Sequence, residues 1–246
     1  MNKERERRIL EIMLKEKKVT VKYLSGILYA SEPSVRRDLA SLEAQGFVRR
    51  IHGGAVLNEN GKGETRIPFL IRELEESREK LVIAEKAAAL VKDGDVIFLD
   101  ASSTAFNMIP FLSGKKDITV ITNGIKAINA LCEYKNIKTI STGGSVHTTC
   151  LALVGEDAFK TVEGYNADLC FFACRGLSLE GKLTDISPEE DHVRLKMIGH
   201  SKKAYLLCTA EKIGKVYYHN ICHLDKLNGA IFGKEPPESL ERYEVI

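Results

Sequence analysis

The stretch TVKYLSGILYASEPSVRRDLASLEAQGFVRRIHGGAV, residues 20–56, decides the fold of the amino-terminal part of the chain. It predicts two short helices that meet at a tight turn formed by Tyr29 and Ala30. Thr20 and Ser31 stand where a hydroxyl can cap each helix, because it accepts an N–H group that lacks a helical partner. Pro33 fits the first turn of the second helix, where no backbone donor is needed. Two helices joined in this way are typical of a helix-turn-helix.

The second helix has two different faces. Its apolar residues recur at i, i+4 and i+7, the spacing of one buried face: Val35, Leu39 and Leu42. The opposite face carries Ser34, Arg36 and Arg37. A short polar side chain beside two guanidiniums suits the base edges and phosphates of a DNA major groove. We therefore interpret this helix as a recognition helix.

A basic strand and a glycine turn follow. Gly46 ends the helical run, residues 47–51 alternate loosely like a strand, and residues 52–56 turn back. Gly53 and Gly54 provide backbone that adopts positive φ at little cost. A strand and turn of this kind after a helix-turn-helix indicate a wing. Singly, an Arg-Arg pair is most often a solvated helix face and Gly-Gly a plain hairpin, but their ordered combination favours DNA binding.

The segment SEPSVRRDLASLEAQGFVRRIHGGAV, residues 31–56, resembles the DNA-binding domain of the DeoR family of bacterial transcription regulators. The family signature is S-x-x-S/T-V/I-R-R-D-L followed by R-x-H-G-G-A. The resemblance implies a winged helix-turn-helix over residues 1–57 that binds a double-stranded operator. The expected DNA-binding residues are Thr20, Ser31, Ser34, Arg36, Arg37, Arg49, Arg50, His52 and Gly53.

The distribution of charge agrees with nucleic-acid binding at one end only. The 246 residues carry a net charge of +2, with 44% hydrophobic and 28% charged residues, as in an ordinary globular protein. Residues 1–57 hold 12 Lys/Arg and 7 Asp/Glu, a net charge of +5, whereas the remainder holds 24 basic and 27 acidic residues, a net charge of −3. This distribution is expected if the basic amino-terminal module binds nucleic acid and the mildly acidic remainder does not.

Other classes of protein are disfavoured. The charged start of the chain lacks the apolar core of a secretory signal, and no apolar run approaches the ~20 residues that span a bilayer. The six cysteines form no C-x-x-C pair, so we expect reduced thiols in a cytoplasmic protein. We expect neither a metal site nor a cofactor, since no His/Cys cluster shows ligand spacing and no G-x-G-x-x-G opens a helix after a strand.

The rest of the chain divides into a linker and an α/β domain. The polar, glycine-rich segment LNENGKGETRI (residues 57–67) and a short extended link over residues 68–72 predict a linker, which we place at residues 58–72, followed by a domain over residues 73–246. Strand and helix patterns then alternate, which predicts a mostly parallel sheet with helices on both faces. The expected strands are residues 96–99, 119–122, 138–142, 169–174, 204–208 and 229–232. The expected helices are residues 73–91, 104–112, 125–134, 157–162 and 188–201.

Small polar residues follow three successive strands. In open α/β sheets, ligands bind past the carboxyl ends of the strands. The sequences there are DASST (100–104), TNG (122–124) and TGGS (142–145), and Lys212 follows a later strand. Such residues are usually helix caps and turns when considered singly. Three such loops at successive strand ends instead favour an anion pocket.

The resemblance to the DeoR family extends through these loops, in the order FLDASST, VITNG, TGG, GLSLEGKLTD and LLCTAEKIG. It implies a Rossmann-like effector domain, similar to ribose-5-phosphate isomerase and glucosamine-6-phosphate deaminase, that senses phosphorylated sugars. The implied effector residues are Asp100, Ser102, Ser103, Thr104, Thr122, Asn123, Gly143, Gly144 and Lys212, and Arg175 is added because it replaces a small residue there. The chain also departs from the family at Thr209 and at Gly233, where aspartates are usual. We therefore expect an atypical, more anionic effector, or loss of sensing.

Three functions are compatible with these features. The first is a repressor of carbohydrate-metabolism genes, a homodimer or homotetramer whose DNA binding a phosphorylated sugar modulates. The second is a phosphosugar isomerase or deaminase, for which Asp100 is the candidate base but lacks an acidic partner at Thr209. The third is an architectural DNA-binding protein with an inert body. The signature motifs favour the first.

Overall fold

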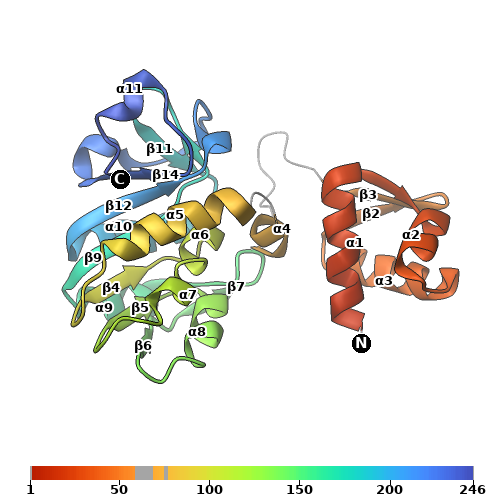
Figure 1. Cartoon of the computed structure of the whole chain (residues 1–246), viewed down its shortest axis with the longest axis horizontal. Helices are drawn as coiled ribbons and strands as arrows, with labels where there is room; N and C mark the ends of the chain where they lie inside the picture. Colours follow the sequence, from red (N-terminus) through yellow and green to blue (C-terminus); the bar gives the residue numbers. More distant parts are fainter. Residues whose placement is uncertain (1, 59–68, 75–76, 246) are drawn as a thin grey trace. The chain divides into compact units, whose positions relative to one another are not determined.

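The computed structural model describes residues 2–58, 69–74 and 77–245. Their contacts divide the chain into two compact units, Met1–Glu75 and Glu76–Ile246 (Figure 1). Each unit has its own apolar core and is described by itself below. Among the described residues, no helix combines the length and the apolar character needed to cross a bilayer.

The amino-terminal unit is a winged helix-turn-helix, as expected. Its elements are α1 (Asn2–Glu16), β1 (Lys18–Thr20), α2 (Val21–Leu28), α3 (Glu32–Ala44), β2 (Val48–Ile51), β3 (Gly54–Leu57) and α4 (Phe69–Leu74). The three strands form an antiparallel sheet in the order β1-β3-β2. Helix α4 begins in the range that the sequence predicts to be a linker, and its Ile71 joins the apolar core of this unit.

The ends of the two central helices follow local chemistry. Thr20 Oγ1 accepts the backbone N–H of Tyr23 at 3.1 Å, so the predicted cap of α2 is confirmed. Tyr29 ends α2 in the left-handed region, with a φ of 49°. Ser31 occupies the cap position of α3, but within the described part of the chain its hydroxyl caps no N–H and instead lies 3.0 Å from Ser34 Oγ. The predicted Ser31 cap is therefore wrong.

One ion pair joins α1 to α3. Asp38 has no exposed surface, and its carboxylate accepts hydrogen bonds from Arg5 Nε at 2.5 Å and Arg5 Nη2 at 3.0 Å. Two parallel N–H groups on one carboxylate fix orientation as well as distance. The pair holds the first helix against the buried face of α3, where Leu39 and Leu42 also pack.

The carboxy-terminal unit is built on a six-stranded parallel sheet in the order β14-β12-β9-β4-β5-β6. The strands are β4 (Val96–Leu99), β5 (Thr119–Thr122), β6 (Lys138–Ser141), β9 (Ala167–Phe172), β12 (Ser201–Cys208) and β14 (Gly229–Phe232). The helices are α5 (Ser77–Ala89), α6 (Ser103–Phe106), α7 (Ile109–Leu112), α8 (Ile125–Leu131), α9 (Glu156–Glu163), α10 (Pro188–Gly199) and α11 (Glu238–Glu241). The predicted doubly covered sheet is confirmed.

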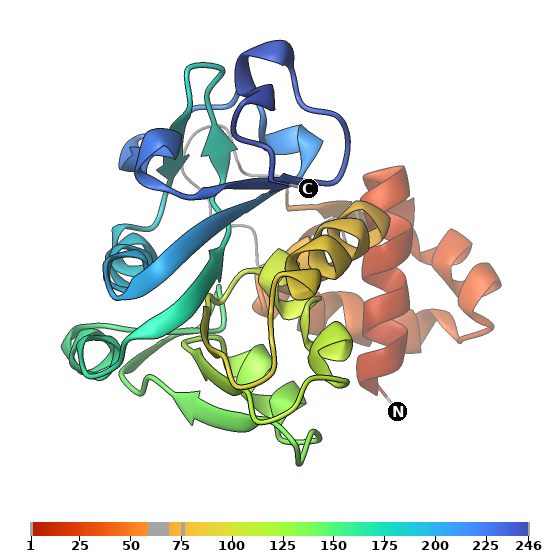
Figure 2. The same ribbon diagram turned by 60° about the vertical axis from the view of Figure 1, so that its left-hand side comes forward.

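Two apolar cores lie on the two faces of this sheet. One contains residues of α5 to α8, and the other contains residues of α9 and α10. Successive strand residues alternate between them: Ile97 and Leu99 belong to the first core and Phe98 to the second. Figures 1 and 2 show helices flanking the sheet on both sides. Burial on both faces explains why these strands are continuous apolar runs.

The structure also contains short strands that the sequence did not predict. These are β7 (Ser145–His147) paired with β8 (Ala152–Val154), and β10 (Gly176–Leu177), β11 (Lys182–Asp185) and β13 (His219–His223), which form a small sheet. The helix predicted over residues 104–112 is two helices, α6 and α7, and Pro110 stands in the first turn of the second. Proline cannot donate a hydrogen bond to the preceding turn, so it favours a helix start there.

The Arg5–Asp38 pair gives a test of the amino-terminal unit. Arg5→Ala leaves a carboxylate without solvent exposure and without its guanidinium, and we expect it to lower the free energy of unfolding of this unit by about 2 kcal/mol. Urea unfolding measured by circular dichroism checks this. The control is Arg7→Ala, which removes an exposed pair with Glu11 and should change stability much less. Equal effects of the two substitutions would contradict this role for Arg5.

Candidate DNA-binding surface and effector site

The exposed face of α3 presents two arginines to solvent. Val35, Leu39 and Leu42 are buried, whereas Arg36 and Arg37 are exposed. Arg36 Nη2 lies 3.2 Å from Glu32 Oε2, and 57% of the Arg36 side chain is exposed. Arg37 Nη2 donates to Ser34 Oγ at 3.3 Å. These contacts hold the guanidiniums on the helix surface, where a DNA groove can replace their surface partners.

The wing is joined to the end of α3. Glu43 accepts hydrogen bonds from the backbone N–H of Arg50 at 2.7 Å and from Arg50 Nε at 2.6 Å, and these bonds lower the pKa of Glu43. Arg49, His52 and Gly53 are exposed. The wing turn needs its glycines: Gly53 has a φ of +74°, and a Cβ on Gly54 would lie 2.0 Å from the Val19 carbonyl oxygen.

In the carboxy-terminal unit, the first strand-end loop is rigid. Asp100 follows β4 and is 1% exposed. Its Oδ1 accepts the N–H of Ser102 at 3.0 Å and its Oδ2 accepts the N–H of Ala173 at 3.3 Å. Ser102 caps α6 by accepting the N–H of Ala105 at 3.1 Å. Asp100 therefore positions the loop through both of its oxygens.

The second and third loops lie beside the first in the order of the strands. A Cβ on Gly124 would lie 3.1 Å from Ala101 Cα, so the loops after β4 and β5 are in contact. The N–H of Thr142 donates to the Thr122 carbonyl at 3.1 Å, which joins the loops after β5 and β6. The loop after β5 is also held by β8, because Asn123 Nδ2 donates to the Leu153 carbonyl at 3.1 Å.

Three buried polar atoms at this edge of the sheet have no hydrogen-bond partner among the residues that the structure describes. They are Thr104 Oγ1, Asn123 Oδ1 and Thr209 Oγ1, which follow β4, β5 and β12. A buried polar atom without a partner is costly unless a ligand or water satisfies it. All three atoms lie at the carboxyl ends of the strands, so a polar ligand bound there could form hydrogen bonds with them.

The remaining predicted residues lie farther along the same edge. Gly143 and Gly144 follow β6, whereas Lys212, half-buried in the 3-10 helix η1 (Ala210–Lys212), follows β12. Strands β9, β4 and β5 separate β6 from β12. Four steps of ~4.8 Å place these strands about 19 Å apart. The loops after β4 and β5 therefore form the centre of the candidate site, with the glycines and Lys212 at its two sides.

The departures from the family pattern have structural counterparts. Glu79 of α5 fills the space beside Gly233, where a Cβ would lie 2.3 Å from Glu79 Cγ. Glu79 Oε1 accepts the N–H of Ala210, next to Thr209, at 2.8 Å. A carboxylate is thus present at the corner where the sequence lacks both aspartates. Arg175 lies 3.9 Å from Asp185 and stacks over Tyr217, so part of its charge is already balanced. Both observations weaken the argument for a more anionic effector.

Sequence reasoning missed the most highly charged part of the unit. Arg194 of α10 is 4% exposed and contacts four carboxylates. Arg194 Nε donates to Asp100 Oδ2 at 3.0 Å, and Nη1 donates to Asp185 Oδ2 at 3.0 Å. Nη1 also donates to Asp191 Oδ1 at 2.6 Å, and Nη2 donates to Glu190 Oε2 at 3.1 Å. The available signal was the acidic run PEED (residues 188–191), which is separated by two residues from the motif that ends in Asp185.

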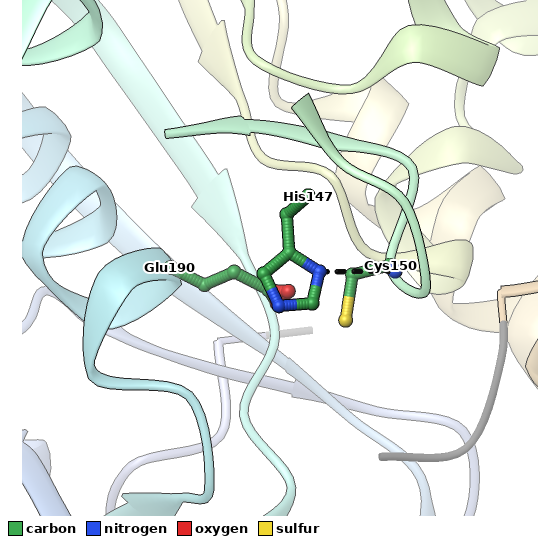
Figure 3. A group of neighbouring side chains, drawn as sticks. All are labelled: His147, Cys150 and Glu190. Carbon is green, nitrogen blue, oxygen red and sulfur yellow. Dashed lines mark hydrogen bonds between the residues drawn. The ribbon is translucent and has the colours of Figure 1, made fainter. Parts of the chain in front are cut away.

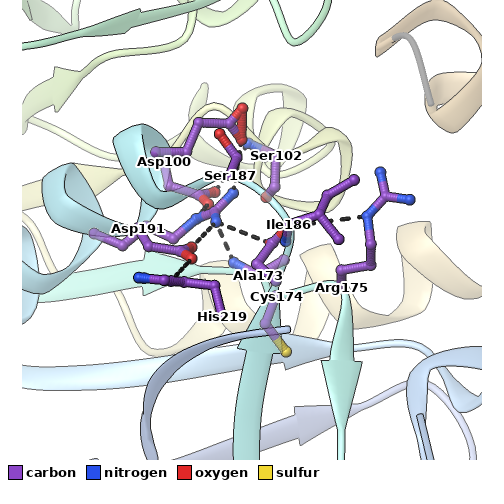
Figure 4. A network of polar contacts seen from close by, with 12 residues as sticks. Asp100, Ser102, Ala173, Cys174, Arg175, Ile186, Ser187, Asp191 and His219 are labelled. Atoms are coloured by element: carbon purple, nitrogen blue, oxygen red, sulfur yellow. Dashed lines mark hydrogen bonds and ion pairs between the residues drawn. The ribbon is translucent and has the colours of Figure 1, made fainter. Parts of the chain in front are cut away.

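The cluster extends to a histidine and perturbs one carboxyl group. His219 Nδ1 lies 2.7 Å from Asp191 Oδ2 (Figure 4). Burial raises the pKa of Asp191 to about 6, and repulsion from Asp185 adds to this, while Arg194 and His219 oppose it. The charge of Asp191 therefore changes as the pH passes through about 6.

A winged helix-turn-helix with solvent-facing arginines, followed by an α/β unit with polar strand-end loops, defines a DNA-binding regulator with a sensor domain. Residues 5–61 match the DeoR-like helix-turn-helix domain, and residues 75–234 match the DeoR C terminal sensor domain. The chain belongs to the DeoR family of transcriptional regulators.

Relatives cover nearly the whole chain. The HTH-type transcriptional regulator GolR of Listeria innocua is 36% identical over 87% of this chain and 83% of its own length. The L-fucose operon activator of Haemophilus influenzae is 30% identical over 97% of this chain and 95% of its own length. These relatives are regulators, so the isomerase or deaminase alternative is set aside.

Ribose 5-phosphate isomerase A from Methanocaldococcus jannaschii aligns with a TM-score of 0.42 at 18% identity, over 56% of this chain and 55% of the enzyme.

The Asp191 carboxyl predicts a pH dependence. Because its pKa is raised from 3.8 to about 6 in the folded state, its contribution to stability is present below pH 4 and is lost as the pH rises through 6. Asp191→Asn removes this titration, so the stability of the variant relative to wild type should rise by about 2 kcal/mol between pH 4 and pH 7. Urea unfolding at several pH values measures it.

The matched control for that measurement is Asp157→Asn, a change at an exposed position of α9. A stability difference between Asp191→Asn and wild type that stays constant with pH would show that Asp191 does not titrate in this range.

Proposed function

We propose that this protein represses carbohydrate-metabolism genes and that a phosphorylated sugar modulates its binding to operator DNA. The observation that carries the proposal is the exposed arginine face of α3 opposite a buried apolar face, in a unit of the DeoR-like helix-turn-helix type. The L-fucose operon activator supports control of a sugar operon, since that relative matches 97% of this chain. Because a regulator of this kind binds the chromosome, we propose that the protein is cytoplasmic.

In the proposed complex, α3 enters the major groove. Arg36 and Arg37 contact base edges or phosphates, and Ser34 supports Arg37 through the hydrogen bond already described. The wing places Arg49, Arg50, His52 and Gly53 along the neighbouring backbone, and Thr20 and Ser31 lie at the two helix starts. One small module makes few base contacts, so we propose a homodimer or homotetramer that reads repeated half-sites.

In the proposed sensor, the effector lies over the loops after β4 and β5. Ser102, Ser103, Thr104, Thr122 and Asn123 line its centre, and the unpaired oxygens of Thr104 and Asn123 are available to its hydroxyl groups. Asp100 orients the first loop, while Gly143, Gly144, Arg175 and Lys212 flank it. The effector changes DNA binding only if it binds two conformations of the protein with different affinities.

Two experiments test the function as a whole. A genome-wide map of DNA occupancy should place the protein at promoters of carbohydrate-metabolism genes, and deletion of its gene should raise their transcription. Calorimetry with a panel of sugar phosphates should then find a ligand that changes operator affinity. Occupancy confined to unrelated promoters, or reduced transcription after deletion, would contradict the proposed role.

The recognition helix gives the first residue-level prediction. Arg36→Ala or Arg37→Ala should weaken operator binding by about 1–3 kcal/mol if the residue reads a base, measured by gel shift at fixed salt. The control is Lys160→Ala, which removes an exposed charge from α9 and should leave affinity unchanged. Unchanged affinity in both arginine variants would refute the assignment of α3.

The sensor domain gives the second residue-level prediction. Lys212→Ala should leave operator affinity unchanged in the absence of effector but raise the effector concentration needed for a response, because a cation at the side of the site is lost. Gel shifts titrated with the effector found by calorimetry measure this. A response equal to that of wild type would place Lys212 outside the site.

A further inference from the structure

Three potential metal ligands converge beside the acidic cluster. His147 ends β7, Cys150 lies in the turn before β8, and Glu190 lies in the first turn of α10. One donor atom from each lies within 4.8 Å of the others. Figure 3 shows the His147 ring between the Glu190 carboxylate and Cys150. Residues from two distant segments of the sequence thus meet at one point.

The Glu190 carboxylate is incompletely satisfied. Glu190 is 4% exposed, and its Oε2 accepts the N–H of Arg194 Nη2 at 3.1 Å. Its Oε1 is buried and has no hydrogen-bond partner among the residues that the structure describes. An unpaired oxygen of a buried carboxylate is costly, and a bound cation would satisfy it.

The donor set selects the class of cation. One imidazole nitrogen, one sulfur and one carboxylate oxygen suit Zn²⁺ and similar borderline-soft ions, whereas Ca²⁺ and Mg²⁺ prefer oxygen ligands alone. With bonds of about 2.0–2.3 Å, the ligand atoms of a tetrahedral zinc site lie about 3.5 Å apart. The three donor atoms lie within 4.8 Å of one another, so a bound cation would have to draw them closer by up to about 1 Å. Three protein ligands leave the fourth position to water or a small ligand.

The surrounding structure supports the donors. His147 and Cys150 are three residues apart in the β7–β8 turn. The N–H of Cys150 donates to His147 Nδ1 at 3.4 Å, and a cation on the imidazole replaces this long bond, because a metal-bound ring has no second free lone pair. Arg194 holds the other oxygen of Glu190, as outer partners of metal-bound carboxylates commonly do. The sequence has no C-x-x-C pair, so no metal site was expected. The H-x-x-C spacing of His147 and Cys150 was not interpreted as a ligand pattern.

We propose that His147, Cys150 and Glu190 bind a Zn²⁺-class divalent cation, which joins the β7–β8 hairpin to α10. Because Glu190 shares Arg194 with Asp100, the bound cation acts on the same guanidinium that fixes the first strand-end loop. The cation site is independent of which effector the protein senses, and it can be tested without DNA or effector.

The test is a titration of the metal-free full-length protein with Co²⁺, which takes the place of Zn²⁺ and gives a visible signal with thiolate. We expect a thiolate-to-cobalt charge-transfer band that saturates at one Co²⁺ per chain and disappears when Zn²⁺ is added. Cys150→Ser should abolish the band. His147→Gln and Glu190→Gln should each weaken Co²⁺ binding at least tenfold. The matched control, Cys132→Ser, changes an exposed cysteine and should keep the band.

Two results would overturn the proposal: no charge-transfer band in the wild-type protein, or a band that persists in Cys150→Ser. X-ray absorption of the wild-type protein loaded with one equivalent of Zn²⁺ decides the question if a variant fails to fold. One sulfur at about 2.3 Å with nitrogen or oxygen at about 2.0–2.2 Å supports the site. A shell without sulfur, or with two or more sulfurs, contradicts it.

Discussion

The carboxy-terminal unit depends on how one buried guanidinium balances its charge. Moving ions out of water costs several kcal/mol each, and only close pairing with complete hydrogen bonding offsets that cost. Each nitrogen of the Arg194 guanidinium meets a carboxylate at the end of β4, at the end of β11 or in the first turn of α10. Among the described residues, only Glu190 Oε1 of this cluster's carboxylates is left without a hydrogen-bond partner. A network with this many shared partners behaves as a unit, because a change at one carboxylate alters the balance for the others. The loop after β4, the end of β11 and the start of α10 therefore share one support.

The main architecture was predictable because it rests on local periodicity. Val35, Leu39 and Leu42 mark the buried face of α3, and continuous apolar runs mark strands with helices on both faces. The short strands β10, β11 and β13 were not predictable in the same way. Strand β11 pairs with β13 across a long separation in sequence, as Thr184 does with Asn220, so no single window of sequence contains both partners. Strand β10 pairs with β11 close by, but it has only two residues and so shows no period of its own.

The candidate site likewise contains residues that could be placed from the sequence and residues that could not. Residues that directly follow strands, such as Ser102 and Asn123, could be placed at one edge of the sheet from strand order alone. Arg194 and Glu79 could not, because each reaches this edge from a helix whose rotation and depth depend on packing. Glu79 places a carboxylate at the corner where the two aspartates of the family pattern are absent, although it lies on α5 and does not follow a strand.

The wing turn limits how proteins of this shape can diverge. Every side chain larger than hydrogen at position 54 collides with the Val19 carbonyl, so this position cannot drift whatever operator is bound. The outward face of α3 has the opposite property, since the partners of Arg36 and Arg37 there are surface groups of the same helix. New operator preferences can therefore evolve on α3 without rebuilding the module, whereas the backbone of the wing turn restricts positions 53 and 54 to glycine whichever DNA sequence is read.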